Sequence, residues 1–469
     1  MDMRLQDRNR IVHHVPATRR FSFRIAALAA FVAIAALSTA QSARAEAMIV
    51  VDADSGRVLY QENATYPWYP ASVTKLMTMY VALKAVKEKR IQLDALLTVS
   101  PIAASQAPTK MGFKAGTTVT LENALAMMMV KSANDMAAVI AEGISGSIES
   151  FADEMNRQAL RIGMTQTSYV NPNGLPADGQ ITSARDMAML ARAIIRDIPE
   201  YEYFTHIPAI KFGRRVTRNF NSLIGRYPGA DGMKTGFICA SGFNLVASAT
   251  RNNKRMIAVV LGAPSSPVRA AKAMQLLERG FSRTTGLSWL QPSLGTLAAM
   301  EPIAAEPPNL RDDICGPRRK RPGIQSDDDN VAISPGTGSG ESGDNAFSLF
   351  STNAASGSIK PSEVLAMPAA NAEPMVVYTG PKRSGAALVA AVAADEVGQT
   401  VSGGKKGKKK KSGVTVRIAA KPDAKPKPEA TQKPKPTAQK QAAKNTAAAK
   451  PPAPAAKKDG TKNAAKSKN

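Results

Sequence analysis

Alternating apolar positions mark the two ends of the region 46–290. Residues 48–51 are apolar, a glycine-containing turn follows, and residues 57–60 repeat the alternation, which predicts a β-hairpin. Residues 231–249 and 255–262 flank a polar Arg-Asn-Asn turn at 251–253. This arrangement predicts a second, longer hairpin near the end of the patterned region.

Between these hairpins the apolar positions recur with helical spacing. One helix is expected over 72–86, because Leu76, Tyr80 and Leu83 fall on one face. Four further helices are expected at 121–129, 135–144, 148–162 and 183–196. Strands at both ends with helices between them predict an α+β fold, in which helices flank an antiparallel β-sheet and form an α-helical subdomain.

The regular pattern ends near Leu290. Residues 291–400 are rich in Pro, Ser, Gly and Ala, and residues 401–469 are a mixture of Lys, Ala and Pro. Such segments bury too little apolar surface to offset the entropy lost on ordering, so we expect a mostly disordered linker and a disordered basic tail. The short apolar patches at 375–378 and 414–418 are expected to dock only transiently.

The N-terminus resembles an export signal. Three arginines, the last of them Arg24, precede an apolar run at 25–37, and Ala43-Arg44-Ala45 has the form of a cleavage site. A run of 13 residues is too short to span a bilayer comfortably. We therefore predict a signal peptide at 1–45, a catalytic domain at 46–290 and a periplasmic protein; the secretion route, general or twin-arginine, stays open.

The charge is concentrated at the other end of the chain. The formal net charge is +25, and residues 401–469 hold 20 Lys and Arg against 3 Asp and Glu. Because the folded region is only mildly basic, the charge does not indicate a nucleic-acid-binding fold. The tail either binds anionic lipid headgroups or acidic envelope polymers, which would hold the protein at the periphery of the inner membrane, or serves only as a solubilising segment.

Cysteine and histidine counts limit the chemistry. Cys239 and Cys315 are the two cysteines, and we favour two free thiols over a disulfide between them. Outside the export segment His206 is the one histidine, and we interpret it as structural. Zinc sites that need several such ligands are therefore excluded, and no metal or cofactor is expected. If a serine is the nucleophile, a group other than histidine must take its proton.

Three short motifs supply such a group. Ser72-Val-Thr-Lys75 begins a predicted helix, Ser132-Ala-Asn134 lies between two helices, and Lys234-Thr-Gly236 opens the last long strand region. Each motif alone is common by chance. All three, in this order and at structural junctions, point to a serine-based acyl-transfer enzyme.

The first motif provides the nucleophile and its base. Residues three apart share a helix face, so the amine of Lys75 can lie beside the Ser72 hydroxyl. Burial and the positive charge of Lys234 would lower the pKa of Lys75 and allow it to accept the proton. The backbone N–H groups of Ser72 and Phe237 are expected to form the oxyanion hole.

The other two motifs would handle the substrate. Ser132 is expected to relay a proton to the leaving amine, and Asn134 offers an amide to a peptide. Lys234 and Thr235 suit a carboxylate, and Gly236 allows the substrate to approach the strand edge closely.

Five segments resemble one family, the serine D-alanyl-D-alanine carboxypeptidases or low-molecular-mass penicillin-binding proteins. They are residues 70–78, 131–135, 177–187, 231–236 and 241–250, and the resemblance covers about 46–285. It implies that Ser72 attacks the carbonyl between two terminal D-alanines of a peptidoglycan stem peptide, and that β-lactams acylate the same serine. Arg269 matches a family arginine near the site of the substrate carboxylate.

The chain also departs from that family. Residues 291–469 lack the strand-dense pattern of a second β-rich domain and the amphipathic anchoring helix that the best-known members carry. A class A β-lactamase would need a deacylating glutamate, and the loop 170–179, its natural place, has none. We favour the carboxypeptidase; a D,D-endopeptidase on the same machinery and a non-catalytic envelope-binding protein remain the alternatives.

Overall fold

The computed structural model describes residues 46–283, 292–317 and 360–403. The predicted signal peptide at 1–45, nearly all of the predicted basic tail and the apolar patch at 414–418 lie outside these ranges. Within them, no helix has the length and apolar character needed to cross a membrane.

A five-stranded antiparallel sheet forms the centre of the domain. Its order is β2 (Val58–Glu62), β1 (Ala47–Asp52), β9 (Lys254–Ala263), β8 (Gly242–Arg251) and β7 (Ala230–Ile238). The first predicted hairpin is confirmed, since β1 pairs with β2. The second is wrong in one respect: the stretch 231–249 is two strands, because the chain reverses at 239–241, where Ser241 N donates to Ile238 O, and β7 then pairs with β8.

The five predicted helices are present, with ends that differ from the predicted ones by at most three residues. They are α2 (Lys75–Lys87), α4 (Leu121–Val130), α5 (Asn134–Ser145), α6 (Ile148–Arg161) and α7 (Ala184–Asp197). Side-chain caps fix two starts: Thr120 Oγ1 accepts from Asn123 N, and Ser183 Oγ accepts from Asp186 N. A sixth helix, α8 (Ser266–Ser282), was not predicted.

The remaining helical elements are mostly short. The short ones are η1 (Ala71–Thr74), α3 (Pro101–Ser105), η2 (Pro199–Thr205), η4 (Leu297–Ala299), α9 (Arg311–Cys315) and α11 (Pro361–Ala366). Helix α12 (Gly385–Gly403), near the end of the described chain, has 19 residues. The remaining strands are the pair β3 (Leu96–Thr98) and β4 (Thr118–Thr120), and a small sheet of β10 (Met375–Val377), β5 (Ala209–Phe212) and β6 (Arg215–Arg218).

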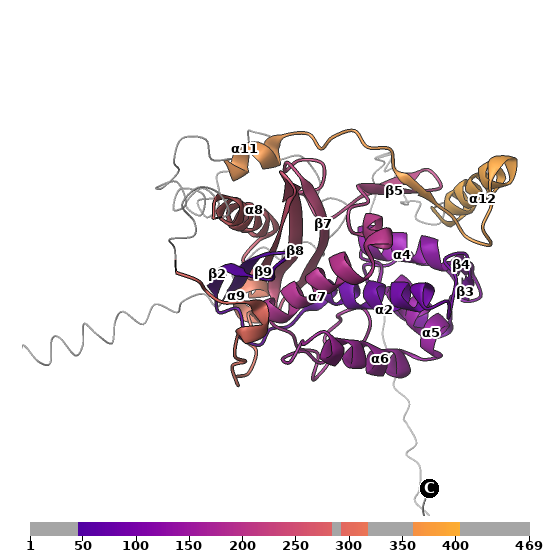
Figure 1. The fold of residues 1–469 in the computed structure, drawn as a ribbon. Helices are drawn as coiled ribbons and strands as arrows, with labels where there is room; N and C mark the ends of the chain where they lie inside the picture. Colours follow the sequence, from indigo (N-terminus) through magenta and orange to yellow (C-terminus); the bar gives the residue numbers. More distant parts are fainter. Residues whose placement is uncertain (1–45, 284–291, 318–359, 404–469) are drawn as a thin grey trace, which may run out of the picture. The chain divides into compact units, whose positions relative to one another are not determined.

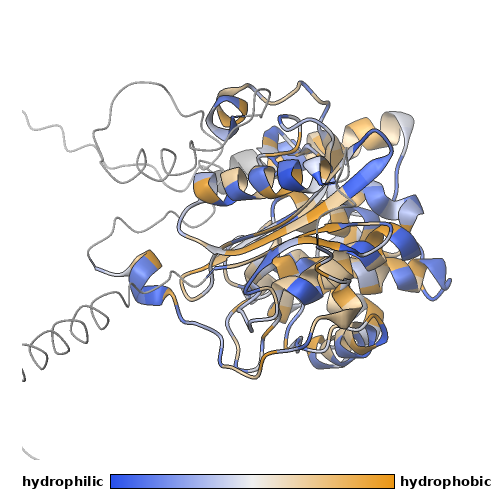
Figure 2. Ribbon diagram, turned by 60° about the vertical axis from the view of Figure 1, so that its left-hand side comes forward, coloured by the Kyte–Doolittle hydropathy of each residue, from blue (hydrophilic) through white to orange (hydrophobic). Residues whose placement is uncertain are grey.

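Helices cover both faces of the central sheet (Figure 1). Alternate residues of β1 enter two separate cores: Ile49 and Val51 join a large cluster with α2, α4, α5 and α7, whereas Val50 joins a smaller cluster with α8. Figure 2 shows the strands of this sheet largely in orange, between helices that alternate blue and orange along their length. The predicted α+β fold with helices flanking an antiparallel sheet is confirmed.

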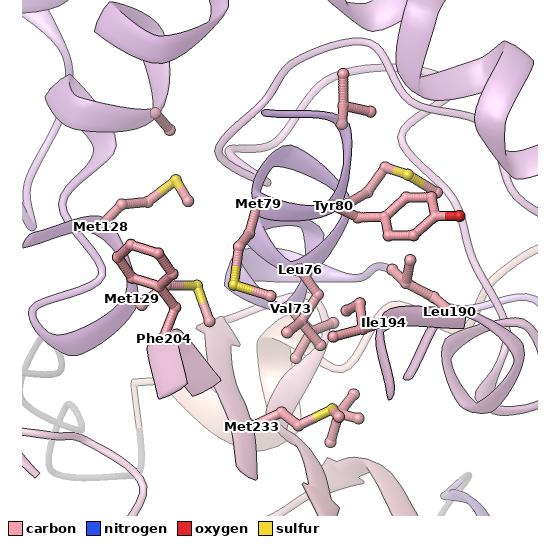
Figure 3. Close-up of a cluster of buried hydrophobic side chains, with 14 of the residues drawn as sticks. Val73, Leu76, Met79, Tyr80, Met128, Met129, Leu190, Ile194, Phe204 and Met233 are labelled. Atoms are coloured by element: carbon pink, nitrogen blue, oxygen red, sulfur yellow. The ribbon is translucent and has the colours of Figure 1, made fainter. Parts of the chain in front are cut away.

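Helix α2 runs through the middle of the large cluster. Figure 3 shows Leu76, Met79 and Tyr80 of α2 among side chains from the surrounding elements. Every residue from Lys75 to Leu83 is buried. A helix that is buried on all sides holds its first residue in a dry environment, which prepares the chemistry of Lys75.

The expectation of free thiols is wrong. Cys239, at the reversal between β7 and β8, forms a disulfide with Cys315 at the end of α9. The segment is also held by backbone pairing, because Leu310 N donates to Ala240 O at 2.9 Å. Cysteines 76 positions apart in the chain could not be paired from their spacing, since only the fold brings them together.

The expectation of a mostly disordered linker at 291–400 is wrong for residues 292–317 and 360–400. Strand β10 pairs in parallel with β5, and Val377 within it is fully buried. Three residues cannot form a strand alone, but an existing strand edge satisfies their backbone and an existing core accepts the valine. The patch at 375–378 is therefore docked in the structure and is not merely a transient contact.

Candidate active site

The first motif places a hydroxyl beside a buried amine. Ser72 lies in η1 and is partly exposed, whereas Lys75, at the start of α2, is fully buried. Lys75 Nζ lies 3.0 Å from Ser72 Oγ, 2.8 Å from Asn134 Oδ1 and 2.6 Å from Asn173 O. The sequence prediction that these two side chains meet on one helical turn agrees with this geometry.

The surroundings of Lys75 favour its neutral form. Burial lowers the pKa of Lys75 well below its usual value, the charge of Lys234 lowers it further, and Asp135 opposes part of this effect. A neutral amine has a lone pair with which to accept the hydroxyl proton. The site therefore places an amine that can accept a proton at hydrogen-bonding distance from a serine. His206 takes no part in this contact.

The second and third motifs are in direct contact. Ser132 lies between α4 and α5 in a left-handed conformation, with φ of 60°, and its Oγ accepts a hydrogen bond from Lys234 Nζ at 3.0 Å. Burial, and then the charge of Arg269, lower the pKa of Lys234 to about 7. Asn134 begins α5, and its Nδ2 donates to Ala107 O.

Strand β7 passes directly against η1. A Cβ atom at Gly236 would lie 2.9 Å from Ser72 N and 3.0 Å from Val73 N, so any larger residue would push the strand away from the nucleophile. The neighbouring Thr235 is buried, and the Phe237 ring packs on Phe243 with centroids 4.2 Å apart. From the sequence, glycine at position 236 was expected to let the substrate approach the strand. In the structure, the close contact with Ser72 already requires a glycine there.

Arg269 lies beneath the site and not at its surface. It comes from α8, is 1% exposed and donates to Ser266 Oγ at 2.8 Å and to Asn244 O at 3.4 Å. Its link to the motifs is electrostatic, through its effect on the pKa of Lys234. A solvent-exposed surface arginine is excluded by this burial.

The sequence analysis missed three residues that build the site. Asn173 offers its carbonyl to Lys75. The Asp135 carboxylate accepts from the backbone N–H groups of Met111 and Gly112, which fixes a loop next to Asn134. Gly174 has a φ of 81°, and a Cβ there would lie 1.8 Å from Ala71 O. The Asn-Pro-Asn-Gly sequence at 171–174 was the available signal for a tight turn.

Comparison with known proteins points to a single family. The family model of D-alanyl-D-alanine carboxypeptidases, peptidase S11, matches residues 34–265. The D-alanyl-D-alanine carboxypeptidase DacC of Escherichia coli is 39% identical over 250 residues, which are 52% of this chain and 62% of that protein. DacA of Haemophilus influenzae is 35% identical over 274 residues, 55% of this chain and 70% of that protein. DacB2 of Mycobacterium tuberculosis is 32% identical over 266 residues, 54% of this chain and 86% of that protein.

The match is partial for some relatives. The chain spans 62% of the length of Escherichia coli DacC and of Bacillus subtilis DacF. Among solved structures, the D-alanyl-D-alanine carboxypeptidase DacD of Francisella tularensis has a TM-score of 0.50 and 31% identity, with 50% of this chain and 70% of that chain covered. The similarity thus falls on the region that holds the three motifs.

Proposed function

The chain belongs to the D-alanyl-D-alanine carboxypeptidase family, peptidase S11, and on this basis we propose that it removes the terminal D-alanine from peptidoglycan stem pentapeptides. The reaction passes through an acyl-enzyme on Ser72. One observation carries the proposal: a buried amine with a lowered pKa, that of Lys75, lies 3.0 Å from the hydroxyl of a partly exposed serine.

Acylation begins with proton transfer. Neutral Lys75 accepts the proton of Ser72 Oγ, and the oxygen attacks the carbonyl carbon between the two D-alanines. Negative charge develops on the carbonyl oxygen, and the backbone N–H groups of Ser72 and Phe237 are the proposed donors to it. The contact between Gly236 and Ser72 N supports this role, because it brings β7 close to the nucleophile.

Departure of D-alanine needs a proton on its nitrogen. Ser132 gives this proton as the carbon–nitrogen bond breaks, and Lys234, 3.0 Å from its Oγ, helps to restore it. Lys234 and Thr235 hold the terminal carboxylate, Arg269 adds positive charge beneath them, and Asn134 orients the peptide. Water then hydrolyses the ester on Ser72 and releases the shortened stem peptide.

β-Lactams should enter the same reaction. Ser72 Oγ would attack the amide carbonyl of the strained ring, and the amine released by ring opening stays tethered to the acyl group. Fluorescent penicillin should therefore label the wild-type protein covalently and fail to label Ser72→Ala. Absence of labelling in a wild type whose circular dichroism shows a folded protein would refute the proposed function.

Two alternatives receive less support. A class A β-lactamase would need a glutamate in the loop 170–179 to activate water; this loop instead gives Lys75 the carbonyl of Asn173. A non-catalytic envelope protein would have no need for a buried lysine at hydrogen-bonding distance from a serine. The carboxypeptidase accounts for both features.

For location, we infer export to the cell envelope. The basic and apolar pattern of residues 1–45 supports export, and the Cys239–Cys315 disulfide fits an oxidising compartment. The 20 basic residues of 401–469 support a contact with anionic lipid at the inner membrane. The full chain should sediment with vesicles containing phosphatidylglycerol at low salt; equal sedimentation of a chain ending at residue 403 would refute the tail contact.

A further inference from the structure

A pocket lies between the nucleophile segment and the loop 170–179, and we name it the acyl-side pocket. Its volume is about 240 Å³, enough for one long side chain. Ala71, which directly precedes Ser72, lines it together with Ile238 of β7 and Leu175 of the loop. The mechanism above uses none of these three lining residues.

The position of the pocket along β7 indicates which part of a substrate would reach it. The substrate carboxylate is assigned to Lys234, and the reacting carbonyl oxygen to the N–H groups of Ser72 and Phe237. The peptide on the other side of the scissile bond therefore lies beyond Phe237, where Ile238 and Ala240 line the pocket. The pocket is thus placed to take a side chain of the acyl half, the part that stays on Ser72.

Both walls of the pocket are fixed by hydrogen bonds. On one wall, Asn171 Nδ2 donates to Leu175 O at 3.0 Å, and Leu175 N donates to Asn173 Oδ1 at 3.0 Å. On the other wall, Leu310 N donates to Ala240 O at 2.9 Å. The larger apolar side chains of the lining are Tyr69, Pro70, Leu175, Pro176 and Ile238. A preformed and mainly apolar pocket favours an alkyl chain.

One acidic residue, Asp178, also lines this pocket. Asp178 and Gly179 are the central residues of a turn in which Gln180 N donates to Ala177 O at 3.1 Å. The turn requires glycine at 179, where φ is 83°, but it places no such requirement on residue 178. Asp178 is exposed, and its carboxylate makes no hydrogen bond or ion pair with any residue that the structure describes. Turn formation and local pairing therefore do not explain an aspartate here.

This carboxylate gives the site opposite charges at its two ends. Lys234 and Arg269 are the basic residues at the end assigned to the substrate carboxylate. Among the described residues that line the acyl-side pocket, Asp178 is the one charged side chain. The amide of Gln180 is already used, since its Nε2 donates to Thr74 Oγ1 at 3.1 Å and its Oε1 accepts a backbone N–H. The matching ligand group is therefore an alkyl chain with a cation at its end.

We propose that the acyl-side pocket binds the side chain of the stem residue that precedes the two D-alanines, and that Asp178 selects stems in which this side chain ends in a free amine. The inference rests on the proposed function, because it concerns the acyl half of the same substrate. The alkyl part packs on Leu175 and Ile238, while the ammonium group stays at the exposed rim beside Asp178. Acylation of the amine removes its charge and with it the attraction. Asp178 is thus a specificity-determining residue that distinguishes free from acylated stems.

The test compares two stem pentapeptides on each variant of the full chain. Both carry L-lysine before the two D-alanines, and its ε-amine is free in one and acetylated in the other; the measured quantity is the ratio of kcat/KM for the free peptide to kcat/KM for the acetylated one. The wild-type ratio should be about five, the size expected for an exposed ion pair. Asp178→Asn should bring this ratio to about one, Asp178→Lys should bring it below one, and Asp178→Glu should keep most of the preference.

Asp94→Asn is the matched control, because it removes the same charge from another exposed turn outside the pocket. Its ratio should equal that of the wild type. Since each ratio compares two substrates on one protein, a variant that is only partly folded lowers both rates and leaves the ratio unchanged.

The outcomes separate this inference from the proposed function. A wild type with equal kcat/KM for the two peptides would overturn the inference and leave the carboxypeptidase in place. A preference for the free amine that persists in Asp178→Asn, or that Asp94→Asn lowers as much, would also overturn it, since the charge of Asp178 would then not be its source. A wild type that releases D-alanine from neither peptide would contradict the proposed function itself.

Discussion

The candidate active site and the C-terminal segments are held in place in opposite ways. In the candidate site, buried polar groups converge: Lys75 by itself lies within hydrogen-bonding distance of Ser72, Asn134 and Asn173. The C-terminal segments at 292–317 and 360–403 are attached by separate contacts spread along their length, among them one disulfide, one three-residue strand and several backbone hydrogen bonds. Loss of one group of the site should therefore damage chemistry, whereas loss of one attachment should damage stability.

The two regions also differ in how far the local sequence determines their structure. The candidate active site depends on specific side chains at short spacings, which can be recognised in the sequence. The C-terminal segments depend on surfaces that other parts of the chain provide, namely the edge of β5 and the turn after β7. Whether these segments are ordered therefore depends on the rest of the domain and not on their own sequence.

The largest effect should come from the candidate active site. Lys75→Met removes the base while keeping an apolar side chain of similar length, so the rate of penicillin acylation should fall about 10³- to 10⁴-fold. Stopped-flow acylation measures this rate. Thermal unfolding should change little or shift upward, because a buried amine is replaced by an apolar group.

Lys84→Met on the same helix is the matched control. Lys84 lies at the other end of α2 and pairs with Glu88 near the surface. The Lys84→Met variant should therefore be acylated at the wild-type rate. An acylation rate in Lys75→Met within tenfold of the wild-type rate would show that another group is the base.

The second prediction concerns the disulfide. Replacing Cys239 and Cys315 by serine should lower the free energy of unfolding by about 2–4 kcal/mol, which urea titration measures. Acylation by the folded variant should change far less than in Lys75→Met. Dithiothreitol should destabilise the wild type but not the double variant. If it destabilised both proteins equally, the disulfide would not be what stabilises this segment.

The third prediction tests the docked strand with two adjacent valines. Val377 is fully buried and Val376 is 37% exposed. Val377→Asp should cost about 2–3 kcal/mol of docking or folding free energy, because it buries a charge without a partner. Val376→Asp should stay within about 0.5 kcal/mol of the wild type. Hydrogen exchange at β5 and β10 reports the effect, and equal exchange in the two variants would contradict the docked position.

The smallest effect is the pH dependence of kcat/KM, which arises from groups of the candidate active site. Lys75 must be neutral to accept a proton, so kcat/KM should rise as pH rises through its lowered pKa. Lys234 must be charged to hold the carboxylate, and its pKa is about 7, so kcat/KM should fall about tenfold per pH unit above that value. The alkaline fall should disappear in Lys234→Arg, whose guanidinium stays charged. If kcat/KM fell equally at alkaline pH in the wild type and in Lys234→Arg, the fall would have to come from another group.

Much of the fold was predictable because its elements show clear periodicity. The hairpin of β1 and β2 and the five helices all followed from apolar spacing. The break between β7 and β8 was missed because the whole stretch 231–249 was taken as one side of the hairpin, although the Ser-Gly pair at 241–242 is typical of a turn. Strand β10 was missed because three residues carry no usable period.

The site was predictable to the extent that its residues occur in motifs. Ser72 and Lys75 share one helical turn, so local geometry brings them together without knowledge of the fold. Asn173 and Asp135 act through tertiary contacts: one offers a carbonyl to Lys75 and the other fixes a neighbouring loop. Sequence spacing contains no information on such contacts. The Cys239–Cys315 pairing was missed for the same reason.

The central claim is that Ser72 becomes acylated, and peptide mapping tests it most directly. Wild-type protein is trapped with benzylpenicillin, denatured and digested, and the modified peptide is sequenced by mass spectrometry. We predict one penicilloyl group per chain, located on Ser72. An adduct on any other residue, or none in a folded protein that releases D-alanine, would contradict the account.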